Sequence, residues 1–139
     1  MDFEELSQEL QQTFLNLYKE HIQVCKSILE KDRCLAPMLR INSASDPKLI
    51  SLQSVDGKVD FLKLVEKTKE ILNSRSFDTA LLSYSSSNVL KESEAVVTYL
   101  FDKTGVGVLY YTAYHFSGFF KKKVVFDKHL LGDVIADAL

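Results

Sequence analysis

The sequence is poor in the residues that break or cross-link a chain. Its 139 residues include five glycines, two prolines and two cysteines, and no tryptophan. So few glycines and prolines exclude collagen-like and low-complexity chains. Two cysteines cannot build the multi-disulfide framework of a small secreted protein, so Cys25 and Cys34 are predicted to be free thiols. The composition, 46% hydrophobic and 26% charged, is that of one folded domain over residues 1–139.

Long apolar runs and an excess of positive charge are also absent. No stretch approaches the roughly 18 apolar residues of a membrane span. The first five residues include three acids, unlike a secretory signal. The net charge is −2, and only three of the 17 basic residues are arginine. These features predict a cytoplasmic protein and argue against nucleic acid as a partner.

The sequence has none of the motifs that mark common catalytic sites. Glycine-rich nucleotide-binding patterns and a Gly-x-Ser-x-Gly motif are both absent. His21 and Cys25 are four residues apart on an expected helix, but their face continues with apolar residues such as Leu17 and Ile28. We interpret the pair as structural rather than metal-binding. The sequence therefore predicts no catalytic residue, no metal and no cofactor, and favours a protein that is not an enzyme.

Three helices are expected from the spacing of apolar residues. The first is predicted over Phe3–Glu30, a stretch without glycine or proline, and would measure about 42 Å. The second is predicted over Phe61–Asn73, with Asp60 as its N-cap. A short third helix is predicted from Lys128, although Gly132 weakens it. The apolar residues that support the third helix are Leu130, Leu131, Val134, Ile135, Ala138 and Leu139.

The remaining apolar segments are predicted to be strands. Pro37 indicates a sheet edge or a strand start, and the pairs Asp56-Gly57 and Ser117-Gly118 and the segment 102–105 are expected turns. Strands in runs predict an α+β single domain with a largely antiparallel sheet of about five or six strands, a long N-terminal helix, a middle helix and a short C-terminal helix. The predicted strands are Cys34–Asn42, Leu49–Val55, Phe77–Ser85, Ala95–Phe101, Val106–Phe116 and Lys122–Phe126.

The amino end of the first helix is a candidate surface for binding a partner. The helix is about as long as the domain is wide, so Leu6, Leu10 and Phe14 are expected to extend past the sheet. A second copy of the chain could bury them, which predicts a homodimer. The competing picture is a helix that bends or breaks near Asn16 and folds back over the sheet.

Aromatic residues supply a second candidate surface. The strand Val106–Phe116 has no plainly polar face, and Tyr110, Tyr111 and Tyr114 are candidate contacts with a partner. The competing interpretation is that these tyrosines pack in the core.

A basic run is the third candidate. Lys121, Lys122 and Lys123 follow Phe119-Phe120, a combination that can contact an anion. The competing interpretation is that the lysines protect a sheet edge from aggregation.

Together these features predict a non-catalytic protein that binds another protein, as an adaptor, chaperone-like or inhibitor-like module. The alternative is a small-molecule-binding domain or minor enzyme with a pocket between the aromatic sheet and the first helix.

Overall fold

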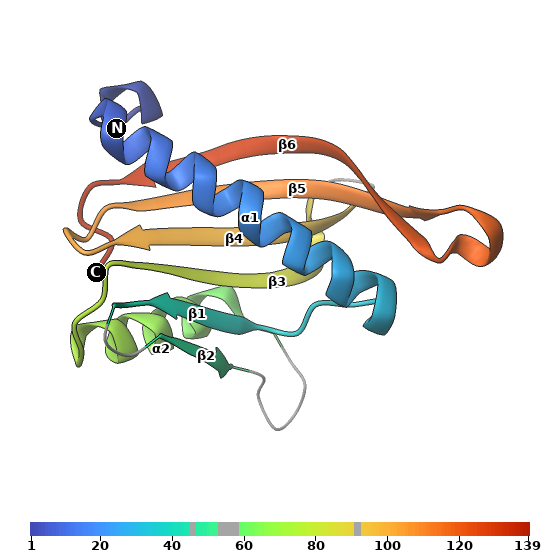
Figure 1. The fold of residues 1–139 in the computed structure, drawn as a ribbon, viewed down its shortest axis with the longest axis horizontal. Helices are drawn as coiled ribbons and strands as arrows, with labels where there is room; N and C mark the ends of the chain where they lie inside the picture. The colour runs from blue at the N-terminus through green and yellow to red at the C-terminus, as the bar shows by residue number, and fades with distance from the viewer. Residues whose placement is uncertain (45–46, 53–58, 91–92) are drawn as a thin grey trace.

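The computed structural model describes residues 1–44, 47–52, 59–90 and 93–139, which form an α+β fold built on one antiparallel sheet (Figure 1). The sheet has six strands in the order β2-β1-β3-β4-β5-β6, and every neighbouring pair is antiparallel. A short 3-10 helix, Phe3–Glu5, precedes the first long helix. The longer elements are α1 (Gln8–Asp32), β1 (Met38–Asn42), β2 (Lys48–Ser51), α2 (Phe61–Asn73), β3 (Thr79–Leu90), β4 (Ser93–Asp102), β5 (Gly107–Ser117) and β6 (Lys123–Ile135).

Helix α1 crosses one face of the sheet diagonally, from β6 toward β1 (Figure 1). It begins after Ser7, whose hydroxyl accepts a hydrogen bond from the Leu10 amide at 3.1 Å. The expected single helix from Phe3 is therefore interrupted at Leu6 and Ser7, where the backbone is extended, and not near Asn16.

The apolar side chains at the amino end of α1 are not left exposed as expected. Leu6 and Phe14 are only 8% and 0% exposed, and Leu10 is half-buried against the same core cluster. The interruption at Leu6 and Ser7 lets Leu6 join that core, and the diagonal path places Phe14 over the sheet. The homodimer was predicted because these side chains were expected to be exposed. Since they are buried within one chain, that reason for a dimer no longer holds.

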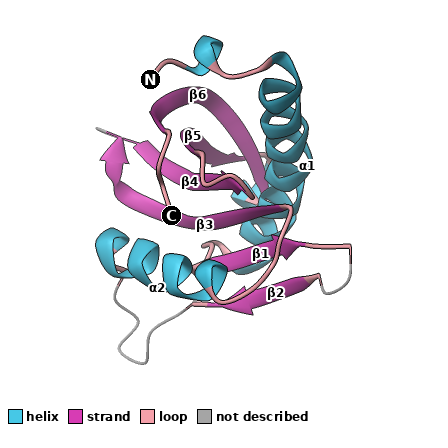
Figure 2. Cartoon of the chain, turned by 90° about the vertical axis from the view of Figure 1, so that its left-hand side faces the viewer, coloured by secondary structure: helices cyan, strands magenta, loops and turns pink. Residues whose placement is uncertain are grey.

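Helix α2 lies on the opposite face of the sheet (Figure 2). Its bounds and its N-cap are as the sequence predicts: Asp60 Oδ1 accepts hydrogen bonds from the amides of Leu62 and Lys63 at 3.0 and 3.4 Å. Leu64 and Leu72 are buried in a second core cluster, which lies on this face. The sheet is therefore covered by one helix on each side.

The turn at residues 102–105 and the strand start at Pro37 are as predicted. Asp102 Oδ1 accepts hydrogen bonds from the amides of Thr104 and Val106, both at 3.1 Å, and Gly105 has a φ of 93°. Pro37 immediately precedes β1, an inner strand, so it marks a strand start rather than an edge. The expected Asp56-Gly57 turn lies outside the described residues.

The carboxyl-terminal segment is a strand and not the predicted helix. β6 pairs with β5 from Lys123 to Ile135, with two irregularities in register. A Cβ on Gly132 would lie 2.7 Å from Cε2 of Tyr111, so glycine permits close packing of that ring against β6. The spacing of apolar residues in this segment is compatible with a helix and also with a strand whose register shifts. Pairing with β5 selects the strand.

Candidate functional site

Three residues with acid–base or nucleophilic side chains meet beneath α1. His21 and Cys25 lie one turn apart on the helix, and Ser83 lies on β3. The His21 Nε2 and the Ser83 Oγ are 2.8 Å apart. All three residues are buried, and Cys25 and Cys34 are both free thiols, as predicted.

Burial suppresses the chemistry of this cluster. Burial is the main cause that lowers the pKa of His21 to about 4, and the nearby Arg40 charge adds to it. Burial likewise raises the pKa of Cys25 to about 12, against an opposing hydrogen bond from Ser83. At neutral pH the imidazole is therefore uncharged and the thiol is protonated, whereas a nucleophilic cysteine needs its thiolate. The described residues also contain no group of three or more metal-ligating side chains.

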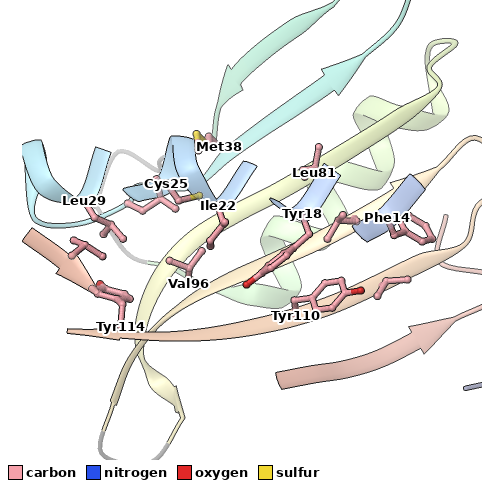
Figure 3. Packing of buried hydrophobic residues seen from close by; sticks show 14 of the residues in the cluster. Phe14, Tyr18, Ile22, Cys25, Leu29, Met38, Leu81, Val96, Tyr110 and Tyr114 are labelled. Atoms are coloured by element: carbon pink, nitrogen blue, oxygen red, sulfur yellow. The ribbon is translucent and has the colours of Figure 1, made fainter. Parts of the chain in front are cut away.

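The tyrosines proposed as partner contacts are mainly core residues. Tyr110 and Tyr114 are buried in the cluster beneath α1, and the Tyr110 ring lies beside that of Tyr18, with ring centroids 4.9 Å apart (Figure 3). Tyr111 is half-buried on the other face, against the α2 cluster. Tyr110 and Tyr114 are thus enclosed within the chain, in agreement with the competing interpretation of core packing.

The diagonal path of α1 leaves part of the sheet uncovered above β1 and β2 (Figure 1). Two hollows of about 460 and 450 Å³ lie there and share Ile28, Met38 and Leu49 in their walls. Val24 on α1 and Leu49 on β2 are 43% and 68% exposed. We call this surface, Val24, Ile28, Met38 and Leu49, the groove.

The groove is bordered by polar groups and by a sheet edge. Arg40 Nη2 donates to Glu20 Oε1 at 2.8 Å at its rim. His21 also lines it, and the His21 Nδ1 has no hydrogen-bond partner among the described residues. Among the described strands β2 is the last on this side of the sheet, and Leu49, which pairs with Arg40, lies on the face beneath α1.

The hairpin of β5 and β6 projects beyond the rest of the molecule (Figure 1). At its end Phe119 and Phe120 are 84% and 76% exposed, with their ring centroids 4.3 Å apart. The three lysines that follow are exposed as well. We call Phe119, Phe120, Lys121, Lys122 and Lys123 the tip. The structure thus brings the basic run together with two exposed aromatic side chains.

The end of α1 fixes the base of this hairpin. Arg33 lies over the Phe116 ring, 3.8 Å from its centroid, and donates a hydrogen bond to the carbonyl of Lys121. Glu30 Oε2 accepts a hydrogen bond from the Val124 amide at 2.8 Å. The tip is therefore attached to a helix as well as to the sheet, which limits the conformations open to it.

Comparisons of the chain with protein-family models, with curated proteins and with solved structures found no match. Among the described residues, no helix has the length and the apolar content that a membrane crossing requires.

Sequence reasoning found the tip lysines but missed the groove. Its residues come from α1, β1 and β2 and are ordinary apolar positions in the sequence. Only the angle at which α1 crosses the sheet leaves them uncovered, and no local pattern reports that angle.

Proposed function

We propose that this chain is a non-catalytic cytoplasmic protein that binds an extended segment of another protein in the groove. The observation that carries the proposal is an open apolar surface, formed by Val24 and Leu49 among others, beside a sheet edge. Exposed apolar surface of this kind is typical of interaction sites.

The edge strand β2 supports an extended segment as the occupant. A segment that pairs with the outer side of β2 adds a strand to the sheet, and its backbone amides and carbonyls find partners there. Alternate side chains of the added strand then lie on the face that carries Leu49, where the groove continues the apolar surface. Apolar side chains at every second position are therefore the expected chemistry of the partner.

The buried cluster supports a function without catalysis. His21 and Cys25 are the residues whose types most resemble a catalytic pair, and both are uncharged at neutral pH because they are buried. Binding through the groove uses neither of them as a reactive group.

The test compares proteins that co-purify with wild-type and variant chains from native cell extract. Val24→Asp and Leu49→Asp each place a charge in the groove at an exposed position, so the fold should be retained. Leu62→Asp, at an exposed position on α2, is the matched control. We expect one protein to be retained by wild type and by Leu62→Asp and lost by both groove variants. The proposal would be contradicted if wild type and all three variants retained the same proteins, or if none of the four chains retained a protein.

A small-molecule ligand in the groove is the second candidate. The unpartnered His21 Nδ1 favours it, and a hollow of about 460 Å³ falls within the range of ligand sites. Native mass spectrometry of the purified chain separates the two candidates, because a retained ligand adds a discrete mass that Val24→Asp removes.

A further inference from the structure

The tip places two large apolar side chains in water at adjacent positions. Phe119, at 84%, is the most exposed large hydrophobic side chain of the described residues, and its neighbour Phe120 is 76% exposed. They contact each other edge to face and Lys122 lies near the Phe120 ring, 5.8 Å from its centroid, but no described core cluster includes either ring. Burial in this chain therefore does not explain why phenylalanine occupies these positions.

The backbone of the tip adopts a conformation that costs free energy. Phe120 and Lys121 have φ values of 63° and 51°, in the left-handed region that favours glycine. Two adjacent residues of this kind cost free energy, and such strain is concentrated at functional sites. Gly118, with a φ of 83°, begins the same turn.

The charge of the tip is of one sign. Residues 119–126 contain three lysines and no acid, although the chain as a whole has a net charge of −2. Lysine suits a diffuse anionic surface, because it acts as a point charge and does not require the bidentate geometry of arginine. The chemistry of the tip is therefore apolar at its end and cationic around it.

The area that the tip can bury favours a lipid surface over a protein as its binding partner. Two phenylalanines bury roughly 300–500 Å² together, below the roughly 800 Å² that each partner of a stable protein interface buries. A lipid surface needs no complementary pocket, and a projecting hairpin can enter it without contact from the rest of the molecule. Anionic headgroups attract each lysine near the surface.

We propose that the tip binds an anionic lipid surface, with Phe119 and Phe120 entering the interfacial region and the three lysines contacting headgroups. The chain then associates with the membrane from one side and does not span it. This binding does not depend on the groove, so Val24→Asp should bind lipid as wild type does.

The first test is co-sedimentation of the full chain with vesicles. One set contains phosphatidylcholine alone, and in the other phosphatidylserine replaces part of it. We expect sedimentation with the second set only, and less of it as salt increases. No sedimentation with phosphatidylserine vesicles at low salt would overturn the proposal, and so would tip-dependent binding of a single-stranded oligonucleotide without vesicle binding.

Matched variants locate the contact. Replacing Lys121, Lys122 and Lys123 with Gln should weaken vesicle binding on the order of a hundredfold at low salt. The control replaces three α2 lysines, Lys63, Lys67 and Lys69, with Gln, which changes the net charge by the same amount. An equal loss in both triple variants would indicate general charge attraction and would overturn the proposal.

A fluorescence measurement tests the entry of the rings into the lipid. The chain has no tryptophan, so Phe120→Trp introduces a single reporter at the tip and Leu62→Trp introduces one on α2. We expect the emission of the tip reporter to shift to shorter wavelength with phosphatidylserine vesicles and that of the α2 reporter to stay unchanged. Sedimentation without that shift would contradict insertion of the tip.

Discussion

The cluster beneath α1 and the tip of the β5–β6 hairpin differ in which side chains they expose to water. Beneath α1, the groups with acid–base and nucleophilic chemistry, His21 and Cys25, are almost fully buried. At the tip, Phe119 and Phe120 have no such chemistry and are largely exposed. Cys25 belongs to the packed cluster beneath α1, whereas the two exposed rings belong to no described core cluster. The difference separates residues that stabilise the fold from residues that are open to contact with a partner.

The largest expected difference between the two regions is in stability. Phe14 is fully buried beneath α1, so Phe14→Ala should lower the free energy of unfolding by about 3–5 kcal/mol. Phe119→Ala removes the same ring from water-exposed surface and should change it by less than about 0.5 kcal/mol. Urea unfolding of both variants measures the difference. Equal losses would mean that the tip is part of the core.

The second expected effect is a loss of stability in acid that depends on His21. The imidazole has a pKa of about 4 in the folded chain and about 6.5 when unfolded, so the unfolded chain binds the proton first. The contribution of His21 is complete above pH 6.5 and is lost as the pH falls from about 6.5 to 4, by roughly 3 kcal/mol.

Urea unfolding at several pH values measures this dependence. His21→Gln keeps a polar partner for Ser83 and removes the titrating group, so its stability should change less over the same range. An unchanged slope in His21→Gln would show that another group causes the acid loss.

A smaller effect distinguishes a strand from a helix at the carboxyl end. In β6, the Cβ of Gly132→Ala meets the Tyr111 ring, so the variant should be destabilised by about 1–3 kcal/mol. In a helix the same substitution would stabilise the chain by about 0.5–1 kcal/mol. Thermal unfolding gives the sign, with Asp133→Ala as the exposed neighbouring control.

Much of this fold could be predicted from local patterns, and the errors have a common cause. α2 and its Asp60 cap follow from a capping residue and a periodic apolar face, both encoded within the segment itself. β6 does not: its apolar spacing suits a helix, and pairing with β5 outweighs that local preference.

The candidate surfaces also differ in whether the local sequence or the packing of distant segments determines them. Exposure of the tip lysines could be predicted, because three consecutive lysines are rarely buried. Burial of Leu6 and Phe14 could not, because it depends on the interruption before α1 and on the path of α1 across the sheet. That same path uncovers the groove, whose residues come from three separate elements.

Photo-cross-linking in the native cell tests most directly the claim that this chain acts by binding a protein in the groove. A photoreactive phenylalanine derivative replaces Val24 in one chain and Leu62 in another, both exposed positions on opposite faces of the sheet. We predict one discrete protein adduct from position 24 and none of the same mass from position 62. No protein adduct at position 24, or the same adducts from both positions, would contradict this account.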